Sequence, residues 1–194
     1  MFTGIITHHG EFLGFQRGRK EMGLSVSEPG LALSLGDSLA VNGVCLSLIR
    51  REGDSLYFNI SQETLETTTL GSMKRGDALN LEAPLTLASP LGGHLVTGHI
   101  DGVGRVRSIS QRSGGKRITV AYPPELRAFF VPKGSVALDG VSLTIASLSS
   151  SVLDVEVIPI TLDQTQLGLW RPGRGVNIEC DIIGKYVYNW ASKS

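Results

Sequence analysis

The sequence SLAVNGVCLSL at residues 38–48 returns 97 positions later as SVALDGVSLTI at residues 135–145. Five of the eleven aligned pairs are identical, and the other six exchange residues of similar size or chemistry. Each copy carries a two-residue turn, Asn42-Gly43 or Asp139-Gly140, between alternating apolar positions. Asn, Asp and Gly tolerate the positive φ that a type I′ turn requires, so each copy predicts a tight β-hairpin.

Other matches extend this repeat over the chain. The same offset carries residues 64–70 onto 161–167 and residues 80–82 onto 177–179, and an offset of 94 carries Thr3-Gly4 onto Thr97-Gly98. Matches in one order indicate the duplication of a unit of about 95 residues, which is long enough for a whole domain rather than a solenoid repeat.

Within each half, the pattern predicts short strands and one short helix. Thr64 and Thr161 are interpreted as helix N-caps, and Gly71 and Gly168 as the residues that end those helices. Glycine supplies 24 of the 194 residues, which is typical of a chain with many tight turns. The fold class predicted is all-β, with two tandem six-stranded Greek-key barrels from an internal duplication.

The C-terminus departs from the repeat. Ile182, Tyr186 and Trp190 recur every four residues, with Ile183 and Val187 beside them, which predicts a short C-terminal helix with an apolar stripe. This helix either covers one barrel end or makes an oligomer contact. We therefore expect an N-terminal barrel at residues 1–94, a C-terminal barrel at 95–181 and an oligomerisation helix at 182–194.

The composition excludes several classes of function. The chain has 18 basic and 18 acidic residues, and this zero net charge argues against a nucleic-acid binder or a polybasic membrane-surface protein. Two distant cysteines, no leader sequence and no long apolar run favour a cytoplasmic protein without a membrane span. The four histidines form no metal-ligand pattern, so we expect no metal.

The motifs then identify a family resemblance. MFTGI at residues 1–5, VNGVCLS at 41–47, GGHLVTGH at 92–99, LDGVSLT at 138–144 and NIECDIIGKY at 177–186 resemble the riboflavin synthases over essentially the whole chain. The resemblance implies a transferase that needs no cofactor. Two molecules of 6,7-dimethyl-8-ribityllumazine would exchange a four-carbon unit, giving riboflavin and 5-amino-6-ribitylaminouracil. It also implies a homotrimer, with each working site between two subunits.

The resemblance also assigns site residues to both halves. For the first barrel it implies substrate contacts from Gly4, Ile5, Ile6, Cys45, Leu46, Ser47, Asn59, Ile60, Ser61, Gln62, Glu63 and Thr64. For the second barrel it implies contacts from Gly98, His99, Ile100, Lys133, Ser142, Leu143, Thr144, Ile158, Pro159, Ile160, Thr161, Leu162 and Asp163. The catalytic roles it implies fall on Cys45, His99, Ser142, Lys133 and Asp181.

Two other functions remain as alternatives. A non-catalytic lumazine- or flavin-binding antenna protein would need only one intact pocket, whereas both halves here keep their polar sets, such as Cys45 with Ser47 and Ser142 with Thr144. A flavin reductase or oligonucleotide-binding barrel is disfavoured by the zero net charge, by the lack of aromatic residues in basic stretches and by the absence of a nicotinamide domain.

Overall fold

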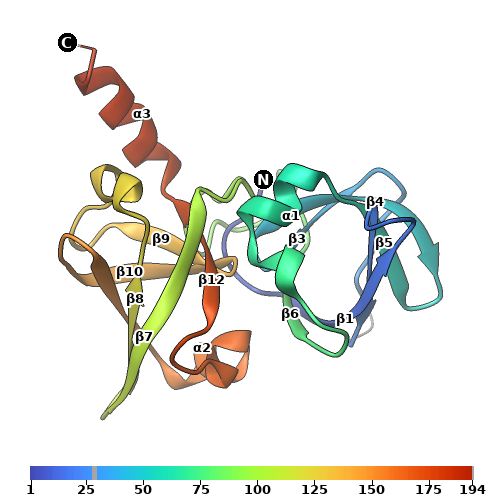
Figure 1. Ribbon diagram of the computed structural model, residues 1–194, viewed down its shortest axis with the longest axis horizontal. Helices are drawn as coiled ribbons and strands as arrows, with labels where there is room; N and C mark the ends of the chain where they lie inside the picture. Colours follow the sequence, from blue (N-terminus) through green and yellow to red (C-terminus); the bar gives the residue numbers. More distant parts are fainter. Residues whose placement is uncertain (28–29, 194) are drawn as a thin grey trace.

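The computed structural model describes residues 1–27 and 30–193 and contains two closed antiparallel β-barrels side by side (Figure 1). The first barrel consists of β1 (His8–Gln16), β2 (Glu21–Val26), β3 (Ser38–Val41), β4 (Val44–Glu52), β5 (Ser55–Asn59) and β6 (Ala78–Glu82). The second consists of β7 (Gly102–Arg112), β8 (Gly115–Ala121), β9 (Ser135–Leu138), β10 (Val141–Leu148), β11 (Val152–Val157) and β12 (Gly175–Cys180). Strand order is β1-β2-β5-β4-β3-β6 in one and β7-β8-β11-β10-β9-β12 in the other. The predicted pair of six-stranded barrels is therefore confirmed.

The hairpins at the centre of the repeat form as predicted. Asn42 and Gly43 have φ values of 45° and 80°, and Asp139 and Gly140 have 44° and 80°, so both turns use the left-handed conformation. Along β4 and β10, alternate residues enter the two barrel cores, while Cys45 and Ser142 lie half-buried on the other face. The period-2 pattern thus separates core residues from candidate site residues.

The short helices differ in detail from the prediction. Ser61, rather than Thr64, caps α1 (Gln62–Thr67), because its hydroxyl accepts from the Thr64 N–H at 3.0 Å. Thr161 lies inside α2 (Pro159–Asp163), whose N-cap Ile158 has no capping side chain. The prediction of Thr64 and Thr161 as N-caps is wrong, because each helix begins one short turn earlier.

The two predicted helix-ending glycines have another role. Gly71 lies in the 3₁₀ helix η1 (Thr69–Ser72), and Gly168 in the 3₁₀ helix η3 (Gln166–Leu169). A Cβ at either glycine would collide with a main-chain carbonyl, that of Leu65 or Leu162. These positions are therefore glycine because the two helical turns approach closely, and not because a helix ends there.

The two barrels meet at their central hairpin turns. A Cβ added to Gly43 would lie 2.7 Å from the Gly140 nitrogen, and one added to Gly140 would lie 2.7 Å from the Gly43 nitrogen. On either side, the Asn80 amide donates to the Asp139 carbonyl, and the Asn177 amide donates to the Asn42 carbonyl, both at 2.9 Å. This reciprocal arrangement relates the two halves by an approximate twofold axis.

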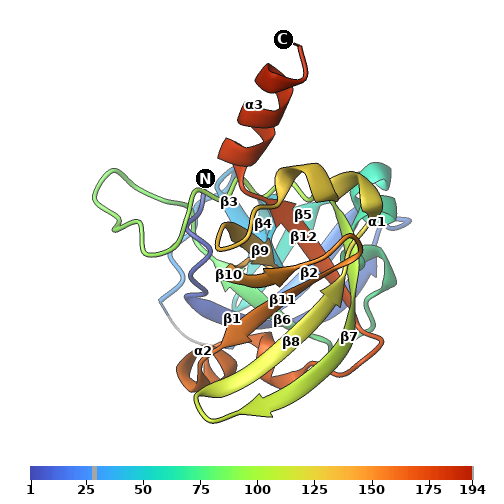
Figure 2. The ribbon, with the colours of Figure 1, turned by 90° about the vertical axis from the view of Figure 1, so that its left-hand side faces the viewer.

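The predicted C-terminal helix is present as α3 (Ile182–Ala191), which projects away from the second barrel (Figure 2). It contacts the body through the 3₁₀ helix η2 (Pro124–Phe129): the Phe129 and Tyr188 rings are 5.3 Å apart, and Gly184 lies against the Phe129 carbonyl. Over the described part of the chain, none of the helices combines the length and apolar character needed to span a membrane. The division predicted at residue 94 stays a prediction; residues 83–101 connect β6 to β7.

Candidate functional site

A short leading segment precedes each barrel, residues 3–6 before the first and residues 97–100 before the second, and each leading segment contacts the other barrel. The Gly98 carbonyl accepts from the Cys45 N–H on the first barrel at 2.9 Å, and the Gly4 carbonyl accepts from the Ser142 N–H on the second at 2.8 Å. Ile100 packs against the core of the first barrel, and Ile6 against that of the second. Each candidate site therefore combines a barrel from one half with a leading segment from the other.

This exchange corrects the grouping expected from the sequence. Residues 4–6 were assigned to the first barrel and residues 98–100 to the second, whereas contacts place them the other way round. The physical reason is the bridge between Phe2 and Val96, which joins the two leading segments antiparallel near the twofold axis. Each segment then continues onto the opposite barrel. An internal alignment pairs equivalent residues but does not reveal which barrel a leading segment contacts.

Both leading segments are held in the same way. The Glu82 carboxylate accepts from the Thr3 N–H and hydroxyl at 2.6 and 2.7 Å and from the Gly4 N–H at 2.9 Å. Glu179 repeats these three bonds with Thr97 and Gly98 at the same distances. Burial raises the pKa of Glu82, and the bonds from Thr3 and Gly4 oppose that rise. Two buried carboxylates thus fix the main chain of the site residues.

Glycine is required at the point where each segment turns. Gly4 and Gly98 have φ values of 77° and 84°, and a Cβ on Gly4 would lie 2.6 Å from the Ser142 Cβ. A Cβ on Gly98 would collide with the Cys45 Cβ. Any side chain at these positions would push the leading segment off its strand and open the site.

The second barrel carries a defined cavity of about 120 Å³ at this junction. It is lined by Gly4, Ile5, Ile6, Val141, Ser142, Thr161, Gln164 and Thr165. Five of the predicted residues come together here, from the leading segment, from β10 and from α2. Val141, Gln164 and Thr165 were not predicted, although each lies within four residues of Ser142 or Thr161. The cavity offers three hydroxyls and an amide beside an apolar wall, which suits a flat heteroaromatic ring with carbonyl groups.

His94 is a further polar residue at this site, and the sequence reasoning missed it. Its Nδ1 lies 2.7 Å from the Ser142 hydroxyl oxygen, and its Nε2 is buried with no hydrogen-bond partner among the described residues. Burial lowers the pKa of His94, and the charge of Asp181 partly opposes that effect. The imidazole is therefore neutral near pH 7. The repeat could not indicate His94, because an offset of 94 places its counterpart before Met1.

The first barrel carries candidate site residues at the equivalent positions, but their side chains differ chemically from those of the second barrel. Cys45 is half-buried beside Gly98, and His99 follows Gly98 in an exposed position where the other half has Ile5. The Ser61 and Thr64 hydroxyls at the start of α1 are 2.8 Å apart. Cys45 and Cys180 are both free thiols. The two half-sites therefore share a backbone plan but differ in their reactive side chains.

The other predicted residues fall into three groups. Leu46, Leu143 and Ile60 are buried, and they pack in the barrel cores. The remaining members of the α1 and α2 segments and of the β4 and β10 faces are exposed or half-buried, namely Ser47, Asn59, Gln62, Glu63, Thr144, Ile158, Pro159, Ile160, Leu162 and Asp163. The third group, Lys133 and Asp181, lies outside the cavity lining.

Lys133 and Asp181 occupy distinctive positions. Lys133 is exposed with φ of 66°, at a position where the first half has Gly36, and its N–H donates to the Ile145 carbonyl. Asp181 caps α3 by accepting from the Ile183 N–H at 3.0 Å. Asp181 reaches the site through its charge, which acts on His94. Within the described part of the chain, the Ser142 hydroxyl is hydrogen-bonded to His94 rather than to Lys133 or Asp181.

Comparison with known proteins agrees with this architecture. The lumazine binding domain family matches the chain twice, at residues 3–84 and 97–181. Riboflavin synthase of Bacillus amyloliquefaciens is 36% identical over all of this chain and 91% of its own length. That of Chlamydia pneumoniae is 38% identical over 95% of this chain and 92% of its own length.

A solved structure shares the fold. LumP complexed with riboflavin superposes with a TM-score of 0.84 and 26% identity, covering 93% of this chain and 99% of that chain. LumP complexed with 6,7-dimethyl-8-(1′-D-ribityl) lumazine superposes with a TM-score of 0.81. The identity to the riboflavin synthases is higher and extends over the whole chain. With two lumazine binding domains and full-length similarity to these enzymes, the chain belongs to the riboflavin synthase family.

Proposed function

We propose that the chain converts two molecules of 6,7-dimethyl-8-ribityllumazine into one riboflavin and one 5-amino-6-ribitylaminouracil. One lumazine gives up a four-carbon unit and the other receives it, so the atoms balance without water, an oxidant or a reductant. The observation that carries this proposal is a pair of related half-sites, one at Ser142 and one at Cys45, in a chain that matches riboflavin synthases from end to end. A reaction between two identical molecules needs two similar sites.

Most of the catalysis is orientation. Two ring systems held in fixed relative positions react as if the step were unimolecular, which replaces a bimolecular encounter. Glu82 holds Thr3 and Gly4, and Glu179 holds Thr97 and Gly98, so the main chain of residues 4–6 and 98–100 supplies rigid edges for the two rings. The acidity of the substrate's own 7-methyl group reduces what the protein must supply as acid or base.

We assign proton handling in the second half-site to Ser142 and His94. The neutral imidazole of His94 is hydrogen-bonded to the Ser142 hydroxyl, so the pair can take a proton from a ring substituent or return one to it. In the first half-site, Cys45 and His99 are the candidates for the corresponding role. This difference fits one half-site holding the donor lumazine and the other holding the acceptor.

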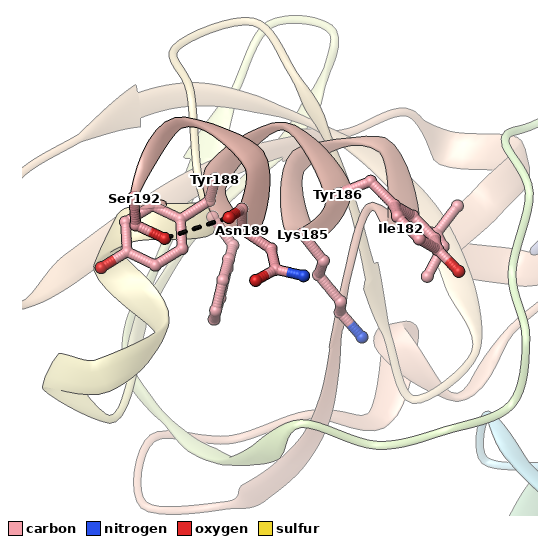
Figure 3. Close-up of a pocket in the computed structure, with 7 residues that line it drawn as sticks. Ile182, Lys185, Tyr186, Tyr188, Asn189 and Ser192 are labelled. Carbon is pink, nitrogen blue, oxygen red and sulfur yellow. Dashed lines mark hydrogen bonds between the residues drawn. The ribbon is translucent and has the colours of Figure 1, made fainter. Parts of the chain in front are cut away.

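We also propose that the working enzyme is a cytoplasmic homotrimer with its sites between subunits. Tyr186 and Trp190 of α3 are 72% and 75% exposed, which gives this helix a large exposed aromatic surface. A cavity of about 450 Å³ lies against the same helix and is lined by residues within 182–192 and by Phe129. Figure 3 shows the side chains of Lys185, Tyr188 and Asn189 at this cavity. Self-association through α3 would bury this surface.

The alternative is an antenna-type protein that binds lumazine or flavin without reacting. The structural similarity to LumP supports it, because that protein was solved in complex with both kinds of molecule. The second half-site favours the enzyme instead, because it combines the hydroxyls of Ser142 and Thr161 with a buried histidine, His94, that is bonded to Ser142.

One assay separates the two functions. The purified protein is incubated with 6,7-dimethyl-8-ribityllumazine alone, and both products are followed by chromatography. We expect riboflavin and 5-amino-6-ribitylaminouracil in equal amounts. Binding of the lumazine, seen as a change in its fluorescence, without either product would support the antenna function and contradict the enzyme.

A further inference from the structure

A separate cavity lies at the tip of the hairpin between β7 and β8, on the second barrel. Its volume is about 340 Å³. It is lined by Arg112, Ser113, Gly114, Gly115, Lys116, Glu156, Val157 and Ile158. Only Ile158 belongs to the residues already assigned to substrate, so the polar part of this cavity has no role in the proposed reaction.

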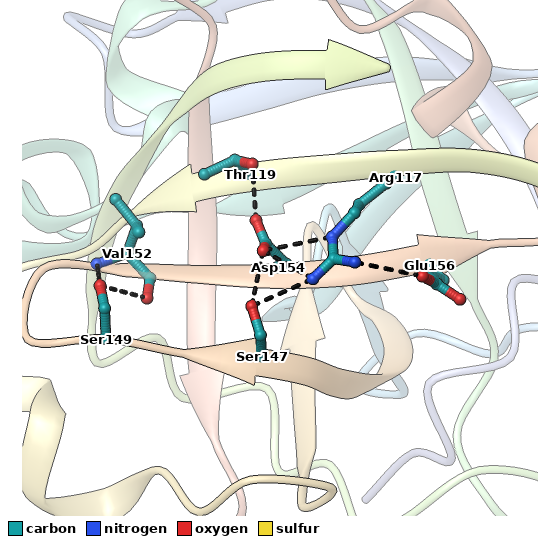
Figure 4. Close-up of polar contacts among 7 residues, drawn as sticks. All are labelled: Arg117, Thr119, Ser147, Ser149, Val152, Asp154 and Glu156. Carbon is teal, nitrogen blue, oxygen red and sulfur yellow. Dashed lines mark hydrogen bonds and ion pairs between the residues drawn. The ribbon is translucent and has the colours of Figure 1, made fainter. Parts of the chain in front are cut away.

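The cavity contains two cations that the fold does not neutralise. Within the described residues, the side chains of Arg112 and Lys116 make no ion pair and no hydrogen bond. Glu156 also lines the cavity, but its carboxylate lies 3.5 Å from Arg117. Arg117 in turn holds Asp154 at 2.9 Å (Figure 4). The acidic residue of the cavity is therefore engaged, and a net positive charge remains at the hairpin tip.

This cavity adjoins the Ser142 half-site. Ile158 lines it, and the Thr161 N–H donates to the Ile158 carbonyl at 3.1 Å. Thr161 lines the cavity that contains Ser142. The two cavities therefore border the same turn of α2, whose pitch is about 5 Å. A five-carbon ribityl chain is long enough to pass along such a turn, from a ring at Ser142 to the hairpin tip.

The corresponding hairpin of the first barrel uses most of its cations within the fold. Its tip is also basic, with Arg17, Arg19 and Lys20. However, Arg17 pairs with Glu21 at 3.0 Å, and Arg19 donates to the Gly71 carbonyl at 2.7 Å. Two of its three cations are thus used within the fold, whereas both cations of the second tip face an open cavity.

The chemistry of the tip indicates what it binds. A neutral polyol end could accept hydrogen bonds from these side chains, but it would not neutralise the charge of Arg112 and Lys116. A phosphate monoester carries a charge of about −1.5 to −2 at pH 7 and accepts strong hydrogen bonds from Arg and Lys. A phosphate at the end of the ribityl chain therefore matches both the charge and the position.

We propose that Arg112, Lys116 and Ser113 form a subsite for the terminal phosphate of a ribityl flavin phosphate whose ring system occupies the Ser142 half-site. The inference rests on the proposed function, because it requires a ribityl ligand in that half-site. It extends that function, because a phosphorylated flavin bound there excludes the lumazine from one of the two half-sites. The phosphorylated derivative of the reaction product would then inhibit the enzyme.

Binding of riboflavin and of riboflavin 5′-phosphate tests the subsite. Both affinities are measured by flavin fluorescence titration for the wild-type protein and for the double variant Arg112→Ala/Lys116→Ala. The control is Lys74→Ala/Arg107→Ala, which removes two exposed cations away from the cavity. We expect the double variant to bind the phosphate about ten-fold more weakly, as for the loss of a charge-assisted contact, and to bind riboflavin normally. The control should bind both ligands like the wild type.

Phosphorus NMR locates the effect. The resonance of riboflavin 5′-phosphate bound to the second half-site should shift in the double variant and remain unchanged in the control. An equal loss of affinity for both ligands, or no loss for either, would overturn the subsite. Riboflavin binding by the wild-type protein tests the proposed function separately. Its absence contradicts both proposals, whereas normal riboflavin binding with an unchanged preference for the phosphate contradicts the subsite alone.

Discussion

His94 differs from the other histidines because the fold removes it from water while leaving one ring nitrogen available. Nδ1 bonds to the Ser142 hydroxyl, and Nε2 is buried without a partner among the described residues. Gly93 provides the room for this contact, because a Cβ there would lie 2.8 Å from the Ser142 hydroxyl oxygen. A buried, neutral imidazole beside a hydroxyl in a ligand cavity is suited to proton transfer rather than to stability alone.

We therefore expect His94→Gln to lower kcat by about 100-fold, because an amide keeps one hydrogen bond but cannot take up a proton. The affinity for riboflavin should change little. Steady-state kinetics across pH, together with fluorescence titration, checks both statements. His8→Gln is the matched control, because the hydrogen bond that His8 makes within the described residues is to the neighbouring Thr7 hydroxyl. A His94→Gln enzyme with wild-type kcat would show that the imidazole is not the proton-handling group.

The environment of Asp139 leads to a prediction about how stability depends on pH. It is completely buried in the interface between the barrels, where burial raises its pKa to about 6, although the nearby Arg174 and the bond from the Asn177 N–H oppose the rise. The folded pKa lies above the unfolded value of about 3.9, so the charged carboxylate destabilises the fold above pH 6. This penalty disappears as the pH falls toward 4. The first half has the neutral Asn42 at this position.

Asp139→Asn should accordingly raise the free energy of unfolding at pH 8 by about 1–2 kcal/mol, less than the full shift of the pKa because Arg174 loses its partner. At pH 4 the two proteins should be equally stable. Urea denaturation at both pH values measures this. The reciprocal variant Asn42→Asp should be destabilised at pH 8, because it would add a second buried carboxylate beside Asp77 and would share Arg174 with Asp139. Equal stability of Asp139→Asn and wild type at pH 8 would mean that the buried carboxylate does not destabilise the fold.

At the scale of the elements, the sequence predicted those that repeat and follow a strong period. The turns at Asn42-Gly43 and Asp139-Gly140, the alternation along β4 and β10, and the stripe of α3 all depend on local patterns, and all are present. Helix starts were harder to place. Ser61 and Thr64 are equally good caps by residue type, and only the geometry shows that the Ser61 hydroxyl accepts from Thr64.

The apolar face of α3 leads to a prediction about assembly. Tyr186 and Trp190 are exposed, whereas Lys185 pairs with Asp101 at 2.6 Å and Tyr188 packs on Phe129. Tyr186→Glu/Trp190→Glu should leave α3 attached but prevent self-association, because each large side chain contributes roughly 1.5–3 kcal/mol when it is buried. We expect a monomer without turnover that still binds riboflavin.

Analytical ultracentrifugation, thermal unfolding and the lumazine assay together check this. The unfolding temperature of the isolated subunit should change little, since both side chains are mostly exposed and the contacts of Lys185 and Tyr188 with the body are kept. Lys193→Glu, a charge change at the end of the helix, is the control. A fully active monomeric variant would contradict sites formed between subunits.

At the scale of the whole molecule, the exchange of leading segments makes the two barrels one functional unit. Asn80 spans the interface by donating to the Asp139 carbonyl and accepting from the Gln166 N–H at 2.8 Å. Asn177 makes the equivalent bonds to the Asn42 carbonyl and the Thr69 N–H. The duplication could be predicted from sequence, but the exchange could not, because it depends on the path of residues 3–6 and 97–100 through space.

This exchange bears on whether the first half can fold and bind ligand without the second. All six strands of the first barrel and its core lie within residues 8–82, and Glu82 still holds Thr3 in a fragment that ends at residue 94. That fragment lacks Gly98 and Ile100, which lie against Cys45 and the first core. We expect it to fold, as shown by a cooperative unfolding transition, but to bind riboflavin weakly.

A fragment of residues 1–100 should fold and also bind riboflavin, at least about ten-fold more tightly than residues 1–94, because the added segment completes the wall of the site and buries Ile100. Fluorescence titration of the two fragments measures the difference. The control is residues 1–100 with Gly98→Val, in which the side chain collides with Cys45 and displaces the segment. It should bind like residues 1–94. Equal affinity of all three fragments would show that the first half-site is complete without the segment from the second half.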